Sequence, residues 1–311
     1  MELSIVIPVF NERENIQPLY QQLKEALAPW GDTSEILFVD DGSIDGSTQE
    51  LRNLTRVDGT VRVLEFVRNF GQTAAMAAGF DHARGRIIIP LDADLQNDPR
   101  DIPRIMEKLA EGYQVVSCWR RERKDAWLSR VLPSRVANLL ISWISGVHLH
   151  DYGCTLKGYQ RDVVQHIRLY GEMHRFIPIF ASWAGAKVTE IPVQHHPRLS
   201  GESKYGIFRT VKVLLDLITV KFLGTYSTKP MYLFGGVGLL SFVGSGALSA
   251  LTLYQKYFEG VKAHRNPLLL LSIFLAIVGV QFILIGLVAE LIVRTYHESQ
   301  GKPTYILKTD R

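Results

Sequence analysis

The sequence predicts an α/β domain with an open, mostly parallel sheet, followed by two membrane-spanning helices. In the first part of the chain, short apolar segments alternate with segments of helical periodicity, which is the pattern of a parallel sheet covered by helices. Several of these apolar segments end at acidic or polar residues. After about residue 229 the pattern changes to two long stretches without charge. The chain is therefore expected to combine a ligand-binding domain with a membrane anchor.

Five short apolar segments are expected to form the sheet. They cover residues 3–9, 35–41, 61–66, 86–92 and 115–118. Helical patterns follow the first three of them, over 16–27, from 45 onward and over 73–83. In an open parallel sheet, ligands bind beyond the carboxyl ends of the strands. Polar residues at these ends are therefore the first candidates for a site.

Two stretches are long enough to cross a membrane. Residues 231–254 and 267–289 contain no Asp, Glu, Lys or Arg. At ~1.5 Å per residue each reaches about 35 Å, against a hydrocarbon core of roughly 30 Å. The alternative, two buried helices of a soluble domain, would favour shorter helices with a polar face. We predict transmembrane helices over 231–254 and 267–290.

The distribution of charge predicts how the chain is placed in a membrane. The start of the chain lacks the basic region and the long apolar run of a signal peptide. Nine Lys and Arg residues flank the two spans on one side, and three lie in the loop between them. We therefore expect a cytoplasmic domain over 1–228, a two-helix membrane region over 229–294 and a cytoplasmic tail over 295–311. Cys118 and Cys154 form no pattern for a disulfide framework or a zinc site.

Two amphipathic segments, about 127–146 and 206–226, combine large apolar residues with Arg and Lys. They are expected to be helices in the membrane interface, with packing on the sheet as the alternative. Within the first span, small residues recur every four positions at Ser241, Ser245 and Ser249. This spacing suits either a homo-oligomer or packing of the two spans on each other. The net charge of +4 includes no dense basic run, so nucleic-acid binding is not expected.

Asp92, Asp94 and Gln96 follow the fourth expected strand at spacing i, i+2, i+4. If the segment stays extended, the three side chains share one face. Two carboxylates and an amide oxygen are hard ligands, suited to Mg²⁺ or Mn²⁺ held together with substrate phosphates. We predict a metal site here.

Asp40 and Asp41 follow the second expected strand. Carboxylates at this position can accept hydrogen bonds from a base N–H or from ribose hydroxyls. The alternative is an Asx turn that caps the next helix, and one residue can do each job. The turn over 8–12 is a candidate to offer backbone groups to a nucleotide.

Three segments, 4–12, 39–43 and 92–96, together resemble the family-2 glycosyltransferases, which have the Rossmann-like GT-A fold. Within that family the chain resembles polyprenyl-phosphate glycosyltransferases, including dolichol-phosphate mannose synthase. The two spans are more similar to the bacterial GtrB-type polyisoprenyl-phosphate glucosyltransferases. Residues 198–205 resemble the family's Arg-x-x-Gly-x-Ser-Lys loop near the acceptor, and residues 151–154 resemble its acidic turn.

The resemblance implies a role for each candidate residue. The nucleotide sugar would be bound by Pro8, Val9, Asn11, Glu12, Asp40, Asp41, Asp92 and Ala93; metal and diphosphate by Asp92, Asp94 and Gln96; and the acceptor phosphate by Arg120, Arg121, Arg198, Ser203 and Lys204. The arginines of 120–121 are shifted from the family's Ser-Arg-Tyr-like element, and membrane-surface charge is their alternative role. Arg198 could instead only anchor its loop.

The implied reaction is inverting transfer of a hexose, glucose from UDP-glucose, onto a polyprenyl phosphate at a bacterial inner membrane. A lipid monophosphate is mostly dianionic at neutral pH, so it can attack without a strong base. Asp94, Arg198 and Lys204 are the expected catalytic residues. Mannose or an amino sugar is the alternative donor sugar. A processive polysaccharide synthase is disfavoured because no Gln-x-x-Arg-Trp motif is present.

Overall fold

The computed structural model describes residues 1–121, 132–165, 167, 169, 171, 173–196, 208–226, 229–262 and 265–300. They fall into two compact units, Met1–Val220 and Lys221–Arg311. The first unit contains the sheet, and the second contains the two long C-terminal helices.

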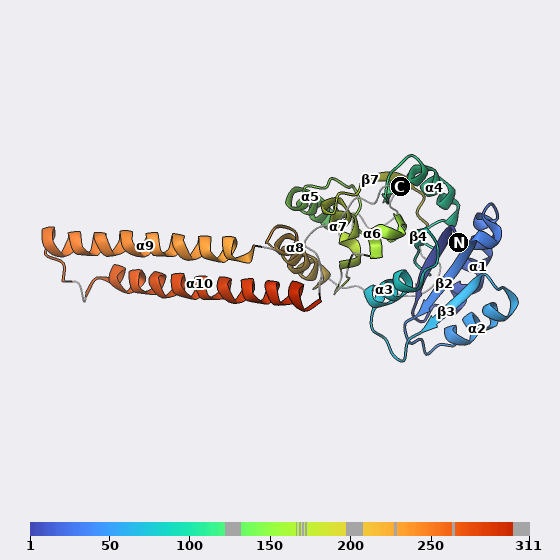
Figure 1. Cartoon of the computed structure of the whole chain (residues 1–311), viewed down its shortest axis with the longest axis horizontal. Helices are drawn as coiled ribbons and strands as arrows, with labels where there is room; N and C mark the ends of the chain where they lie inside the picture. The colour runs from blue at the N-terminus through green and yellow to red at the C-terminus, as the bar shows by residue number, and fades with distance from the viewer. Residues whose placement is uncertain are drawn as a thin grey trace. The chain divides into compact units, whose positions relative to one another are not determined.

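The first unit is built on a seven-stranded sheet with the order β3-β2-β1-β4-β6-β5-β7. Figure 1 shows the edge strand β3 and its neighbour β2 beside helix α2, Ser47–Val57. All neighbouring pairs are parallel except the two that involve β6. The strands are β1 Leu3–Val9, β2 Ser34–Asp40, β3 Val61–Glu65, β4 Ile87–Pro90, β5 Val115–Arg120, β6 Lys157–Gln160 and β7 Val188–Val193. This architecture confirms the predicted mostly parallel sheet and its five predicted strands, and it adds β6 and β7.

Helices cover both faces of the sheet. The helices described before residue 229 are α1 Arg13–Leu27, α2 Ser47–Val57, α3 Gln72–His82, α4 Ile102–Ala110, α5 Leu132–Ser145, α6 Arg161–Gln165, α7 Ile177–Trp183 and α8 Phe208–Tyr226, with short 3₁₀ turns η1 Gly31–Thr33, η2 Pro99–Asp101 and η4 Met173–Phe176. Helices α1, α2 and α4 pack on one face through residues such as Leu19, Leu51 and Ile105. Helices α3, α6 and α7 pack on the other face through residues such as Phe80 and Ile177. Burial on both faces explains why β2 is buried along its whole length.

The two predicted amphipathic segments form α5 and α8 where the structure describes them; residues 127–131 and 206–207 lie outside the described residues. Each helix contributes to a third apolar cluster, through Ile141 from α5 and through Leu217 and Val220 from α8. Each also exposes large apolar side chains. Trp143 of α5 is 80% exposed and Ile218 of α8 is 59% exposed. The alternative of packing on the rest of the domain therefore accounts for only one side of each helix.

The second unit is a pair of long helices, α9 Pro230–Phe258 and α10 Pro267–Gln300. Residues 230–258 and 267–295 are long and apolar enough to cross a membrane. Small residues lie between the two helices, because a Cβ atom on Gly238 would approach the carbonyl oxygen of Gly279 to 2.9 Å. The Ser245 hydroxyl donates a hydrogen bond to the Ser272 carbonyl oxygen at 2.7 Å. The small-residue face of α9 thus serves, at least in this part, to pack α9 on α10.

Candidate active site

The predicted nucleotide residues lie at the side of the sheet where the parallel strands end, which we call the carboxyl edge. Val9, the last residue of β1, accepts a hydrogen bond at its carbonyl oxygen from the Asp41 N–H at 2.8 Å. The Asn11 N–H donates to the Ser43 hydroxyl at 3.0 Å, and the Glu12 N–H donates to the Ser47 hydroxyl at 3.1 Å. The loops after β1 and β2 therefore form one rigid unit.

Asp40 is occupied by its own loop. One carboxylate oxygen accepts the Ser43 N–H at 3.0 Å, and the other accepts the Thr48 hydroxyl of the first turn of α2. The side chain is 1% exposed. The alternative, an Asx turn that caps the next helix through Asp40, Asp41 or Ser43, is not what Asp40 forms, because its backbone bond spans three residues and α2 begins after Gly46 without a side-chain cap. The Asx turn before α2 belongs to Asp45, whose Oδ1 accepts the Ser47 N–H at 3.0 Å.

Asp41 holds a different loop. Its two carboxylate oxygens accept the N–H groups of Phe70 and Gly71 at 2.6 and 2.9 Å. The neighbouring Gly42 has a φ of +72°, and a Cβ atom there would lie 2.5 Å from the backbone of Arg68. Only glycine fits this close approach. Asp41 and Gly42 together fix the loop between β3 and α3 against the end of β2.

The segment 92–96 does not stay extended. Strand β4 ends at Pro90, and Leu95 has a φ of +60°, which turns the chain. The expectation that Asp92, Asp94 and Gln96 share one face of an extended segment is therefore wrong, because a left-handed residue breaks the alternation on which it rests. Within this turn an oxygen of Asp94 accepts the Gln96 N–H at 3.2 Å.

Asp92 and Asp94 nevertheless lie close enough to influence each other. Burial and the neighbouring Asp94 carboxylate raise the pKa of Asp92 to about 6, although a hydrogen bond from the Thr155 side chain opposes this shift. A cation between two crowded carboxylates would relieve their repulsion. The described residues hold no group of three or more His, Cys, Asp or Glu side chains suited to a metal. Two carboxylates are enough for a divalent ion that takes its other ligands from phosphates and water.

Arg120 and Arg121 differ in their surroundings. Arg120 forms a two-point contact with Asp151, with Nε–Oδ2 and Nη2–Oδ1 distances of 2.7 and 3.1 Å. Burial acts to lower the pKa of Arg120, but Asp151 outweighs it and raises the pKa overall, with a smaller contribution from Asp92. Arg121 is exposed. Arg120 thus links the predicted acidic turn 151–154 to segment 92–96, which we call the metal motif.

Lys157, at the start of β6, is a site residue that the sequence did not indicate. It is 2% exposed, and its ammonium donates hydrogen bonds to the carbonyl oxygens of Tyr152 and Cys154. Burial lowers its pKa, and it interacts electrostatically with Asp92. The charge of this buried lysine acts to lower the pKa of Asp92. Its only signal in the sequence was its position three residues after the acidic turn.

The predicted acceptor residues Arg198, Ser203 and Lys204 lie outside the described residues. The chain that leads to them is described as far as residue 196, and it is attached to the metal motif. The His196 N–H donates to the Gln96 carbonyl oxygen at 2.9 Å, and His195 forms a β-bridge with Asn97.

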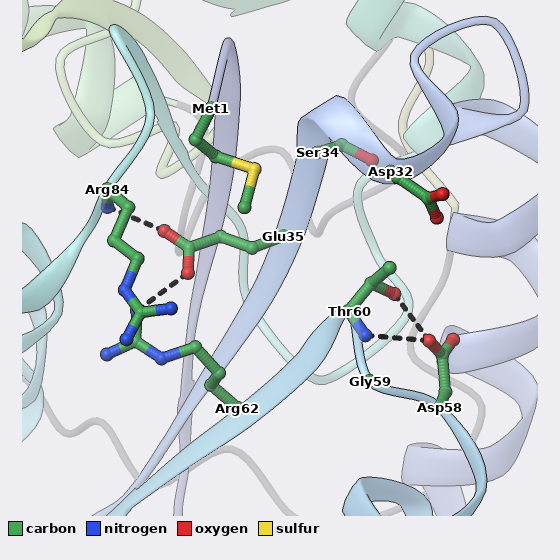
Figure 2. Close-up of a pocket in the computed structure, with 9 residues that line it drawn as sticks. All are labelled: Met1, Asp32, Ser34, Glu35, Asp58, Gly59, Thr60, Arg62 and Arg84. Atoms are coloured by element: carbon green, nitrogen blue, oxygen red, sulfur yellow. Dashed lines mark hydrogen bonds and ion pairs between the residues drawn. The ribbon is translucent and has the colours of Figure 1, made fainter.

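A cavity of about 310 Å³ lies elsewhere, beside the starts of β2 and β3 (Figure 2). Its central carboxylate, Glu35, accepts hydrogen bonds from Arg62, the Arg84 N–H and the Ser4 hydroxyl, each at 2.6 Å. Burial raises the pKa of Glu35, but these partners outweigh it and lower the pKa overall. The cavity contains none of the predicted site residues.

Residues 4–168 match the sequence model of glycosyl transferase family 2. The chain belongs to this family. It is 42% identical to the dodecaprenyl-phosphate galacturonate synthase of Rhizobium johnstonii, over 99% of this chain and 92% of the relative. It is 36% identical to the undecaprenyl-phosphate 4-deoxy-4-formamido-L-arabinose transferase of Salmonella paratyphi B, over 99% of this chain and 93% of the relative. The predicted resemblance to polyprenyl-phosphate glycosyltransferases is confirmed, and the chain is a glycosyltransferase.

The fold also matches solved structures. Glucosyl-3-phosphoglycerate synthase from Mycobacterium tuberculosis, in complex with phosphoglyceric acid, aligns with a TM-score of 0.54 at 16% identity, over 72% of this chain and 79% of that one. A second structure of that enzyme, with Mn²⁺, UDP and glucosyl-3-phosphoglycerate, aligns with a TM-score of 0.52 over the same shares of the two chains. These matches confirm the predicted GT-A fold.

Proposed function

We propose that the protein transfers a sugar, with inversion, from a nucleotide diphosphate donor to a polyprenyl phosphate. The observation that carries this proposal is the pair Asp92 and Asp94 at the carboxyl edge of a family-2 glycosyltransferase sheet. The two curated relatives, which align over nearly the whole chain, are both named for a polyprenyl-phosphate acceptor.

On the donor side, we assign the nucleotide to the rigid unit formed by the loops after β1 and β2. Asp41 is the nucleoside candidate of its pair, because the loop that it binds also reaches Asp92, whereas Asp40 binds Ser43 and Thr48 in the segment that follows it. Asp92 and Asp94 would hold Mg²⁺ or Mn²⁺, with Gln96 and Ala93 beside them. A divalent ion there supplies neutralisation of the leaving diphosphate.

On the acceptor side, the residues must align a second anion rather than remove a proton. A lipid phosphate is already ionised at neutral pH, so a strong base is not required. We assign Arg198, Ser203 and Lys204 to this phosphate, supported by the attachment of residues 195–196 to the metal motif. Arg121 is a further candidate because it is exposed, whereas Arg120 acts chiefly through Asp151.

We propose that the protein resides in a bacterial inner membrane with the catalytic unit on the cytoplasmic side. Helices α9 and α10 are the spans. The exposed apolar faces of α5 and α8, which include Trp143 and Ile218, suit helices that lie in the membrane interface. The same side of the membrane would then present both the nucleotide sugar and the phosphate of the lipid.

The sugar is best sought beyond glucose. The names of the two relatives specify galacturonate and 4-deoxy-4-formamido-L-arabinose, and neither specifies glucose. This favours the alternative of another donor sugar over the UDP-glucose that the sequence resemblance implied. The purified protein should be given undecaprenyl phosphate and a panel of radiolabelled donors: UDP-glucose, UDP-galacturonic acid, the formamido-arabinose donor and GDP-mannose.

The expected result is metal-dependent appearance of label in the organic-soluble lipid with one donor. Product that still contains the lipid phosphate and one sugar supports the proposal. Label incorporated into a long water-soluble polymer would identify a processive synthase instead. Failure of every donor to label lipid, with folded protein and added metal, would contradict the proposed function.

Homo-oligomer formation remains a prediction. The prediction came from the spacing of Ser241, Ser245 and Ser249. Of these, Ser245 of α9 forms a hydrogen bond to Ser272 of α10 within the same chain. Light scattering in detergent should show a mass above that of one chain, and a single-chain mass would contradict the prediction.

A further inference from the structure

The start of α3 contacts both acidic pairs of the carboxyl edge. Its first two residues and the two residues before them form a short segment, 70–73, at the end of the loop that follows β3. The backbone N–H groups at the beginning of this segment bind Asp41. The side chain of Gln72 donates a hydrogen bond from Nε2 to Oδ1 of Asp92 at 2.8 Å. One segment of four residues therefore connects the nucleoside candidate with the metal candidate.

The segment is itself held in place. The Thr73 hydroxyl and the His174 ring nitrogen Nδ1 lie 2.7 Å apart in a buried contact. Behind it, α3 packs on the sheet through Met76 and Phe80. These contacts restrict the backbone from which the Gln72 amide extends.

The partners of Asp92 differ in kind from those of Asp151. Asp92 receives hydrogen bonds from the Gln72 amide and from the Thr155 side chain, which are both uncharged. Asp151 is paired with the guanidinium of Arg120. Neutral donors orient a carboxylate without cancelling its charge, which is what a metal ligand requires of its supporting hydrogen bonds.

We infer that Gln72 is a positioning residue of the metal site, whose amide fixes the Asp92 carboxylate in the orientation that binds a divalent cation. Segment 70–73 then sets the separation between the nucleoside and the metal, because it is bonded to Asp41 at one end and to Asp92 at the other. This inference rests on the proposed function. Loss of such a supporting partner typically weakens metal binding about 10- to 100-fold.

The test is a Mn²⁺ titration of the full-length protein in detergent, followed by electron paramagnetic resonance at saturating UDP. Gln72→Met keeps the length of the side chain and removes the donor. It should weaken Mn²⁺ binding about 10- to 100-fold while the thermal unfolding temperature stays near that of the wild type. Thr155→Val removes the second neutral donor with little change of volume, and it should weaken Mn²⁺ binding in the same direction.

Gln17→Met is the matched control. Gln17 donates to the Glu50 carboxylate at the same distance, 2.8 Å, but at an exposed position between α1 and α2. It should leave Mn²⁺ binding unchanged. Wild-type affinity in Gln72→Met would overturn the inference; if that variant does not fold, wild-type affinity in Gln72→Ala, which also removes the donor, would do so.

A further variant separates this inference from the proposed function. If Asp92→Asn loses Mn²⁺ binding and Gln72→Met keeps it, only the role of Gln72 is wrong. If Asp92→Asn also binds Mn²⁺ like the wild type, the metal site itself is wrong, and the inference falls with it.

Discussion

Two acidic pairs lie at the carboxyl ends of β2 and β4, the strands on either side of β1, and they have different hydrogen-bond partners and charged neighbours. After β2, the oxygens of Asp40 and Asp41 accept hydrogen bonds from three backbone N–H groups and one hydroxyl. After β4, Asp92 and Asp94 crowd each other, and the pKa of Asp92 is raised to about 6 by burial and by Asp94. The first pair organises the loops of the site. In the second pair the two carboxylates repel each other, and a bound cation would reduce this repulsion.

The comparison shows what a sequence motif leaves undetermined. Both pairs are two carboxylates near the end of an apolar parallel strand, so both fit the same ligand-binding rule. The difference comes from the donors that surround them. A third carboxylate, Asp151, belongs with the satisfied group, because Arg120 neutralises it.

The largest effect that would test the role of the second pair is expected from removal of the Asp94 carboxylate. Asp94→Ala should lower sugar transfer to lipid phosphate by about 10²- to 10³-fold, since it removes electrostatic stabilisation of the leaving diphosphate. Transfer of radiolabel into organic-soluble lipid measures the effect. Unfolding temperature and membrane insertion should stay as in the wild type. Near-normal turnover would show that the second pair holds no catalytic metal.

Replacement of Arg120, which is paired with Asp151, should lower the stability of the protein much more than replacement of the exposed Arg121. Arg120→Met leaves the buried Asp151 carboxylate without its partner and should destabilise the protein by about 3–5 kcal/mol. Arg121→Met, at an exposed position, should change stability by less than about 0.5 kcal/mol. Thermal unfolding in detergent measures both. Equal effects of the two changes would contradict the structural role given to Arg120.

Asp92→Asn should stabilise the metal-free protein. Because the folded state raises the pKa of Asp92 from 3.8 to about 6, it binds this proton more tightly than the unfolded chain does. The associated stability is present below pH 4 and is lost as pH rises through about 6. In EDTA at pH 7, Asp92→Asn should regain up to about 3 kcal/mol. A decrease in unfolding temperature under these conditions would refute the raised pKa.

Asp41→Asn should lower the stability of the protein, whereas Asp92→Asn should raise it. The side-chain amide can accept only one of the two N–H groups of the β3–α3 loop, so one buried donor loses its partner. We expect a destabilisation of about 1–3 kcal/mol, largely independent of added metal. Thermal unfolding with and without Mn²⁺ measures it. An increase in stability would place Asp41 with the metal pair instead.

Much of this arrangement could be predicted from the sequence. The five predicted strands are apolar, and two of them, 35–41 and 86–92, end at acidic residues, so these carboxyl ends indicated the candidate site from the sequence. Strand β6 was missed because Lys157–Gln160 is short and mixes polar with apolar residues. Strand β7 carries a proline, which weakens a strand pattern. The turn at Leu95 was missed because nothing in a leucine indicates a positive φ.

The supporting residues of the site could not have been found from local patterns. Gln72 and Thr155 lie 83 positions apart by their numbers, and they meet at Asp92 only because β6 pairs with β4 and α3 packs behind the sheet. Lys157 was likewise missed, because nothing in the sequence indicates that this lysine is buried. A sequence motif indicates the residues that would contact a ligand. The residues that support them are brought together by tertiary packing and are not found from local sequence.

The most direct test is Mn²⁺ binding at saturating UDP in four single variants: Asp40→Asn, Asp41→Asn, Asp92→Asn and Asp94→Asn. Electron paramagnetic resonance measures the bound metal in each purified, folded protein. The account predicts that the two changes after β4 abolish Mn²⁺ binding and that Asp40→Asn leaves it close to that of the wild type. Asp41→Asn, which removes a contact of segment 70–73, should weaken Mn²⁺ binding without abolishing it. Mn²⁺ binding that survives both changes after β4 would contradict the account.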